Sequence, residues 1–180
     1  SNFSNFQWVY NATDSSSDNY CNSYSGMAWE VIELSDGDLV AVGNNCAPGD
    51  GGREAHVVKF SYDGQPDWHY NYPEAYTAKS IAETLDGGLI VAGGIYNDNE
   101  LDVVLIKTDS DGNQQWIKTF GADGKDVGYD VQQTSDGGYI ITGKTQSFGN
   151  GSYDVWLIKT DSNGNEEWNQ TFGGTNSDVG

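Results

Sequence analysis

Short apolar runs alternate with clusters of turn-forming residues in the C-terminal third of the chain. The runs are rich in Val, Ile, Tyr, Trp and Thr and are only about five residues long, which suits strands better than helices. Asp136-Gly137 and Asn163-Gly164 each separate two such runs, and both dipeptides are hairpin signals because their residues tolerate positive φ. The pattern therefore predicts four strands: Tyr129–Thr134, Tyr139–Gly143, Val155–Thr160 and Glu167–Phe172.

The same unit occurs three times along the chain. Three sets of landmarks recur in register: Asp36, Asp86 and Asp136; Lys59, Lys107 and Lys159; Trp68, Trp116 and Trp168. A period of about fifty residues is typical of propeller or solenoid arrays. Four short antiparallel strands in each unit make a meander, which is the blade of a β-propeller. We therefore predict an all-β fold of four-stranded antiparallel blades, with three complete units and partial units at both ends.

The predicted units divide the chain as follows. Residues 1–26 contain a partial blade, with one strand around Trp8 and a long polar loop, and complete units occupy 27–72, 77–120 and 126–172. Residues 173–180 repeat the segment that begins at Gly121, so a further unit starts there.

A meander sorts its connections by end. The hairpin turns lie at one end, and the loops that join the second strand to the third, or one unit to the next, lie at the other. The loops after the second strands differ in length and content: Asn44–Glu54, Gly94–Glu100 and Lys144–Tyr153. Binding usually resides in variable loops on a repeated scaffold, so we expect the working face at this end.

The chain is strongly acidic. Its 27 Asp and Glu residues outnumber 8 Lys and Arg residues, which gives a net charge of −19. This charge repels the phosphates of nucleic acids and anionic lipids, so we expect neither as a partner. No apolar stretch approaches the ~18 residues that a membrane span needs, so we expect no membrane insertion.

Two motifs of the unit carry a resemblance. Asp-Gly-Gly-Tyr-Ile-Ile-x-Gly begins at Asp136, and Leu-Ile-Lys-Thr-Asp-x-x-Gly-Asn-x-x-Trp begins at Leu157. Together they resemble the β-propeller repeats of secreted and cell-surface proteins of bacteria and archaea. The segment from Asp161 to Trp168 is also similar to the tryptophan-docking motif of quinoprotein propellers, although Ser61 replaces the Asp in the first unit. The resemblance implies a propeller in an extracellular or cell-surface location, where such repeats serve adhesion, surface coats and enzymes alike.

The repeated tryptophans Trp68, Trp116 and Trp168 follow the turn glycine by four residues. Their recurrence at one geometric position is what packing between blades demands, whereas a ligand site would use unique residues. We therefore interpret them as structural, with stacking on a sugar or cofactor as the alternative.

Residues that could carry out catalysis or bind metal are sparse. Asp109–Asn113 has some features of a calcium loop, but its Gly stands at the fourth position and not at the sixth as in an EF-hand, so turn chemistry explains it better. Calcium stays open for the acidic loops Asn97–Asp102 and Asp123–Asp126, and we expect no other cofactor. His56 and His69 are the only histidines, and the sequence has no nucleophile elbow, metal-spaced His cluster or phosphate loop.

Two classes of function therefore compete. One is a non-catalytic extracellular protein, a propeller-repeat building block of a surface or filamentous assembly or an adhesion module. The other is a segment of a larger propeller enzyme, quinoprotein-like or acting on polysaccharide, with its catalytic residues outside this chain. A repeat with inward-facing charged residues unlike those of its neighbours would favour the enzyme. Strands such as Leu39–Gly43 and Ile140–Gly143 match closely and are mostly apolar, which favours the first class.

The chain offers candidate modification sites. Cys21 and Cys46 are its only cysteines, and we predict a disulfide between them because a hairpin brings together the start of its first strand and the end of its second. Two unpaired thiols are the alternative. Four asparagines satisfy the N-glycosylation pattern and are predicted sites in a glycosylating cell: Asn2, Asn11, Asn150 and Asn169.

Three blades leave apolar sheet faces at both ends of the array. Propellers close with about four to eight blades, and such large apolar faces should be covered. We therefore expect further copies of this chain, or further blades of the same polypeptide, as partners, with glycans as candidate ligands.

Overall fold

The computed structural model of the protein describes residues 27–46, 53–97 and 100–178. Within these ranges all twelve regular elements are strands, and they form three four-stranded antiparallel sheets. The predicted all-β fold of four-stranded antiparallel blades is therefore confirmed. The partial unit predicted at residues 1–26 lies outside the described residues.

Each sheet is a meander in which strands adjacent in sequence are adjacent in space. The first contains β1 (Met27–Glu33), β2 (Leu39–Cys46), β3 (Arg53–Phe60) and β4 (Pro66–Tyr72). The second contains β5 (Thr77–Glu83), β6 (Leu89–Asn97), β7 (Glu100–Thr108) and β8 (Gln114–Phe120). The third contains β9 (Val127–Gln133), β10 (Tyr139–Thr145), β11 (Asp154–Thr160) and β12 (Glu166–Phe172).

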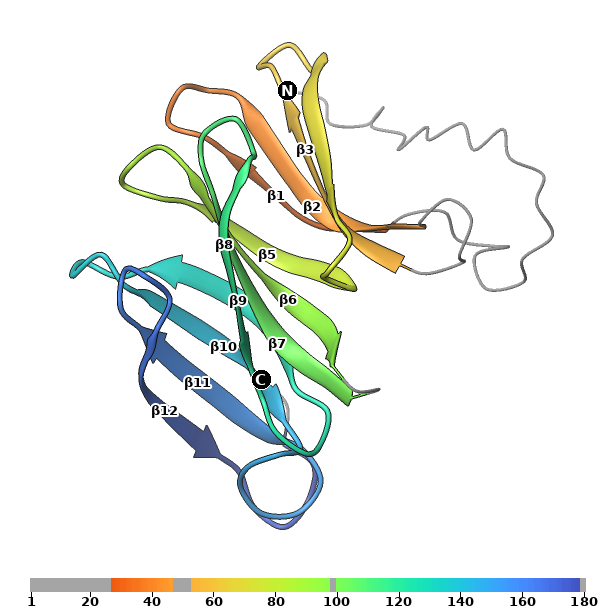
Figure 1. Cartoon of the computed structure of the whole chain (residues 1–180), viewed down its shortest axis with the longest axis vertical. Coiled ribbons are helices and arrows are strands. Elements are labelled where there is room, and N and C mark those ends of the chain that lie inside the picture. The colour runs from red at the N-terminus through yellow and green to blue at the C-terminus, as the bar shows by residue number, and fades with distance from the viewer. Residues whose placement is uncertain (1–26, 47–52, 98–99, 179–180) are drawn as a thin grey trace, which may run out of the picture.

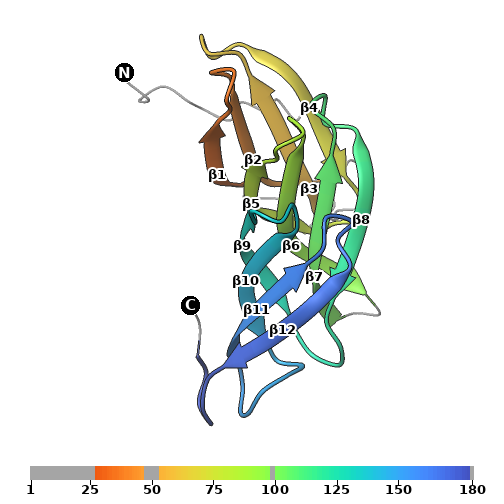
Figure 2. The ribbon, with the colours of Figure 1, turned by 90° about the vertical axis from the view of Figure 1, so that its left-hand side faces the viewer.

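The three sheets, called blades 1, 2 and 3 below, lie face to face in chain order (Figure 1). The first strands β1, β5 and β9 lie along one side of the array, and the fourth strands β4, β8 and β12 lie along the other (Figure 2). This arrangement is compatible with propeller-like blades, and the three sheets do not close into a ring.

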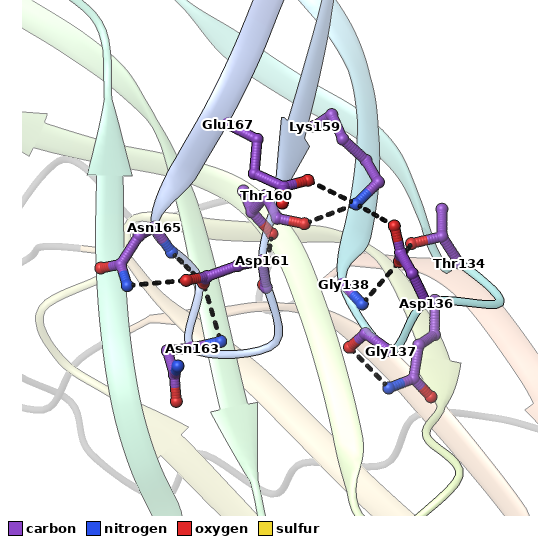
Figure 3. A network of polar contacts seen from close by, with 11 residues as sticks. Thr134, Asp136, Gly137, Gly138, Lys159, Thr160, Asp161, Asn163, Asn165 and Glu167 are labelled. Carbon is purple, nitrogen blue, oxygen red and sulfur yellow. Dashed lines mark hydrogen bonds and ion pairs between the residues drawn. The ribbon is translucent and has the colours of Figure 1, made fainter.

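The turn aspartates fix the inner hairpin of each blade. In blade 3 the Asp136 carboxylate accepts hydrogen bonds from the Thr134 hydroxyl at 2.5 Å and the Gly138 amide at 3.0 Å, while Gly137 supplies the positive φ of 85° (Figure 3). Lys159 on β11 then forms an ion pair with Asp136 at 3.0 Å. Blade 2 repeats this contact between Lys107 and Asp86 at 3.1 Å. The recurring Asp and Lys therefore tie the turn between the first two strands to the third strand.

Two apolar clusters fill the spaces between the sheets. The cluster between blades 1 and 2 includes Val42, Val57, Val91 and Ile106, and Trp68 packs against it. The cluster between blades 2 and 3 is built in the same way, with Trp116 packed against Ile90, Leu105, Tyr139, Ile141, Trp156 and Ile158. Blade 2 is therefore buried on both faces, which explains the uninterrupted apolar run of Val103 to Ile106 in β7.

Every first strand carries a β-bulge at the same place. The register with the second strand shifts between Ala28 and Glu30 in β1 and between Ala78 and Ser80 in β5. In the third sheet the partner of Thr142 is Asp130 and the partner of Gly143 is Gly128. A bulge re-aims the extra side chain, which is Trp29 in blade 1, Lys79 in blade 2 and Tyr129 in blade 3.

Within the described part of the chain there is no helix of the length and apolar character that a membrane span requires.

Candidate functional site

The outer strands β4 and β8 each pack on the outer turn of the following blade through a tryptophan. A Cβ atom built on Gly112, in the β7–β8 turn, would lie 2.8 Å from the ring of Trp68 in β4. A Cβ atom on Gly164, in the β11–β12 turn, would lie 2.7 Å from the ring of Trp116 in β8. Only glycine allows the ring to approach this closely, so Trp and Gly form one docking contact that repeats at both junctions.

Hydrogen bonds accompany the docking contact. The Tyr72 hydroxyl donates to the Gly112 carbonyl at 2.7 Å, and the Tyr70 hydroxyl donates to Asn113 Oδ1 at 3.1 Å. At the next junction Lys118 Nζ donates to Asn165 Oδ1 at 3.1 Å. The outer turns of blades 2 and 3 thus receive both apolar and polar contacts from the blade before them.

A second set of contacts joins the inner hairpins. Glu83 in β5 accepts hydrogen bonds at 2.7 Å from both the amide and the hydroxyl of Ser35, in the β1–β2 turn. Gln133 in β9 accepts one at 2.7 Å from the Leu85 amide in the β5–β6 turn. These contacts hold both edges of adjacent blades, so the junctions fix the position of one blade against the next.

The outer face of blade 3 has the side chains of a docking face but no neighbour among the described residues. Phe120 at the end of β8 is 8% exposed, whereas its counterpart Phe172 at the end of β12 is 50% exposed. Trp168 is 47% exposed, whereas its counterpart Trp116 packs against a core cluster. Four further residues, buried in blade 2, have only half-buried counterparts in blade 3: Ile90, Ala92, Val103 and Leu105, against Ile140, Thr142, Val155 and Leu157.

A group of cations and aromatic rings lies at the loop end of the sheets. Lys79 Nζ sits 3.0 Å from the centroid of the Trp29 ring, and Trp29 Nε1 donates to Asn44 Oδ1 at 3.1 Å. Lys144 Nζ lies 4.3 Å from the centroid of the Tyr153 ring and 5.7 Å from that of Tyr129.

The group continues towards blade 1. The Arg53 guanidinium lies 5.8 Å from the centroid of the Tyr76 ring, and Tyr76 meets Tyr96 edge to face at 4.8 Å. We call this group the basic–aromatic cluster; its members are Trp29, Arg53, Tyr76, Lys79, Tyr96, Tyr129, Lys144 and Tyr153.

Electrostatics link the three cations of the cluster. Burial, followed by the charges of Arg53 and Lys144, lowers the pKa of Lys79 to about 8. The Trp29 ring opposes this shift because the face of an aromatic ring attracts an ammonium group. The surroundings of Lys79 therefore disfavour its charged form, and a nearby anion would stabilise that form.

The basic–aromatic cluster was not predicted from the sequence. Strands such as Leu39–Gly43 are mostly apolar, but the charged residue that departs from the repeat, Lys79, lies on the first strand of blade 2. The differing residues at the bulge position, Trp29, Lys79 and Tyr129, were the available signal. These differences indicate a site only once the bulge is known, and the alternation of polar and apolar residues does not predict a bulge.

The predicted modification sites are only partly within the described residues. Cys21, Asn2 and Asn11 lie outside them, and Cys46 ends β2 with its side chain not described, so the disulfide stays a prediction. Asn150 is exposed in the β10–β11 loop. Asn169 is exposed on β12, where its Oδ1 accepts a hydrogen bond from Trp156 Nε1 at 3.1 Å.

The two histidines lie side by side in blade 1. His56 is buried on β3 with its Nδ1 against Asn71 Oδ1, and burial lowers the pKa of this imidazole. Its ring centroid lies 5.6 Å from that of His69.

Two of the aspartates considered for calcium, Asp109 and Asp126, cap a turn and a loop. Asp109 accepts hydrogen bonds from the amides of Asp111 and Asn113 at 3.0 and 2.8 Å, which is turn chemistry. The buried Asp126 accepts a bond from Ser147 Oγ at 2.5 Å and one from the Gln146 amide at 3.2 Å. Among the described residues, no three His, Cys, Asp or Glu side chains are grouped as metal ligands would be.

Comparisons with known proteins concern the fold. No family model and no curated protein matches the chain. Among solved structures, the chain is similar to a protein of unknown function from Bacteroides caccae, with a TM-score of 0.54 and 14% sequence identity. The similarity covers 84% of this chain and 48% of that one, so this chain spans about half the length of the structure it matches.

Proposed function

We propose that this chain is a β-propeller-repeat building block, a non-catalytic structural and interaction protein of the cell surface or extracellular space. Its outer blade 3 face docks a further blade of the same repeat. The observation that carries the proposal is a difference in burial between equivalent residues. Trp116 and Phe120 are covered by blade 3, whereas their counterparts Trp168 and Phe172 are about half exposed. Blades 2 and 3 thus have the same docking surface, and only that of blade 2 is covered by a neighbouring blade.

The energetics favour an occupant for this face. Burying a large apolar side chain is worth about 1.5–3 kcal/mol relative to leaving it in water. Trp168, Phe172, Val155 and Leu157 all present apolar surface on one face of blade 3. A contiguous exposed apolar surface of this kind marks an interaction site.

The shape of the contact favours another blade as the partner. At both described junctions the tryptophan rests on a turn glycine with positive φ, which is Gly112 at 81° and Gly164 at 74°. Blade 1 offers the same feature in Gly64, with φ of 84°. Trp168 would therefore rest on the outer-turn glycine of a further blade, and for this chain in solution that blade belongs to a second copy.

The location and the role in assembly rest on the repeat itself. The motif resemblance is to repeats of secreted and cell-surface proteins, and the net charge of −19 favours solubility in such a setting. A head-to-tail contact between blade 3 of one copy and blade 1 of the next would build either a closed ring or an open filament. The longer chain of the matched solved structure is consistent with more blades than three.

Sedimentation velocity on the 180-residue chain tests the proposal. We expect the wild type to self-associate as its concentration rises, and Leu157→Arg to shift the population to monomer because the charge would be buried at the contact. Leu85→Arg makes the same change at a side chain that is 85% exposed in the β5–β6 turn of blade 2, away from the blade 3 face, and is the control for charge. A wild type that stays a monomer with a cooperative melt at all concentrations would refute the proposed docking.

A further inference from the structure

The basic–aromatic cluster uses none of the residues that form the tryptophan-docking and inner-hairpin contacts between the blades. It gathers one cation from each blade: Arg53 from β3, Lys79 from β5 and Lys144 from β10. Lys59, Lys107 and Lys159, by contrast, sit in ion pairs with turn aspartates, and Lys118 bonds to Asn165. Half of the eight cations thus have structural partners, and three of the other four converge here.

The cations of this cluster, Arg53, Lys79 and Lys144, have no ion-pair partner in the part of the chain that the structure describes. The charged groups that act on Lys79 are the other two cations, so the three repel one another. In a protein with a net charge of −19, three mutually repelling cations that form no ion pair with a described carboxylate are expected where an anion binds.

Aromatic rings surround these cations and are open to solvent. Trp29 is 46% exposed and Tyr129 is 36% exposed. Flat aromatic faces of this kind combine apolar contact with polar tips, and they pack well against the C–H faces of sugar rings. Cations beside them offer charge-assisted hydrogen bonds to carboxylate or sulfate groups.

We propose that the basic–aromatic cluster binds an acidic saccharide, a short glycan that carries uronic acid or sulfate groups. Its anionic groups pair with Arg53, Lys79 and Lys144, and its sugar rings stack on the exposed aromatic faces. The open site spans three blades, which fits an oligosaccharide better than an enclosed small ligand. Lys144 borders the docking face proposed for blade 3, because it pairs with Val155 in β11, whereas Arg53 and Lys79 lie on blades 1 and 2. Lys79→Gln therefore tests the site apart from the docking.

The overall charge argues against a longer polyanion. Repulsion by the protein grows with the number of charges on the ligand, so a nucleic acid is disfavoured relative to a short glycan with few charges. An acidic peptide would use the same cations but lacks rings that stack on Trp29 and Tyr129. The test therefore compares glycan with peptide.

Isothermal titration calorimetry on the full chain, at low salt, provides the test. The probes are trigalacturonate as the acidic glycan, maltotriose as the neutral glycan and triglutamate as the acidic peptide. The variants are Lys79→Gln, Lys144→Gln and, as the control, Lys118→Gln, which removes the same charge from the outer strand β8. Thermal melts of each variant establish that it is folded.

We expect trigalacturonate to bind and maltotriose and triglutamate to bind at least about tenfold more weakly. Each cluster variant should lose about tenfold in affinity, the worth of one charge-assisted hydrogen bond, while Lys118→Gln keeps it. No binding of trigalacturonate, equal binding of triglutamate, or equal loss with Lys118→Gln would each overturn the proposal. Sedimentation reports on the docking face separately, so failure of one proposal is distinguishable from failure of the other.

Discussion

At the scale of single residues, the junctions depend on glycines at which a neighbouring ring occupies the space that a side chain would need. Gly112 and Gly164 have positive φ and also lie against a tryptophan ring. Gly87 has a positive φ of 78° with no atom within 4 Å of its would-be Cβ. Substitutions at these two kinds of glycine therefore distinguish the free energy of backbone strain from that of lost docking.

We expect Gly112→Ala to destabilise the protein more than Gly87→Ala. Both changes cost about 1–2 kcal/mol because alanine resists the left-handed region. Gly112→Ala also displaces the Trp68 ring, which adds about 1–3 kcal/mol of overpacking. Urea unfolding of both variants measures the difference, and equal losses of stability would show that the ring is not docked on Gly112.

Lys79 gives a second prediction, in the pH dependence of stability. Its folded pKa of about 8 is below the ordinary value of 10.5, so the charged form is disfavoured by folding. This cost is fully present below about pH 8 and disappears as pH rises towards 10.5, because the folded state loses the proton first. Lys79→Gln should therefore be more stable than wild type near neutral pH, and the gap should close in alkali. Urea unfolding across this range tests the expectation, which a gap independent of pH would contradict.

At the scale of elements, the Asp–Lys contact holds each hairpin to the next strand. In blade 3 Lys159 joins Asp136 at 3.0 Å and Glu167 at 2.9 Å, and also donates to the Thr160 carbonyl at 2.8 Å (Figure 3). One ammonium thus links the β9–β10 turn, β11 and β12 near the turn end of the blade. This explains why Asp and Lys recur together in each unit.

We expect the turn contact of blade 3 to weaken in acid. The Thr134 hydroxyl, the Gly138 amide and Lys159 hold the pKa of Asp136 well below its ordinary value of 3.8. Its contribution to stability is therefore present above the ordinary value and is lost as pH falls towards the folded pKa. Asp136→Asn should be less stable than wild type at neutral pH, with a gap that shrinks in acid. Asp123→Asn, in an exposed loop, is the control for charge, and thermal melts at several pH values measure both.

The sequence predicts these elements well because each hairpin turn has a local signature, a dipeptide that ends in glycine. Asp136-Gly137 and Asn163-Gly164 mark the hairpins, and the positive φ indeed falls on Gly137 and Gly164. The bulge at Lys79 has no such local signature, since an extra residue changes only which way a side chain points. The convergence of Arg53, Lys79 and Lys144 therefore required the arrangement of three sheets, which no single unit encodes.

At the scale of the whole molecule, the array is a row of blades with one docking face still open. Trp68 and Trp116 rest on glycines of the next blade, and Trp168 has the same position in its own blade. Trp29 provides a matched reference, because it is 46% exposed and Trp168 is 47% exposed. The two indoles therefore start with equal access to solvent, and only one of them lies on the proposed docking face.

Hydroxyl-radical footprinting across a series of protein concentrations tests the docking claim most directly. The reactivity of each indole reports its solvent access, and mass spectrometry separates the peptides that contain Trp29 and Trp168. We predict that Trp168 becomes protected as the concentration rises, because a second copy covers it, while Trp29 keeps its reactivity. A Trp168 that stays as reactive as Trp29 at every concentration would contradict the account.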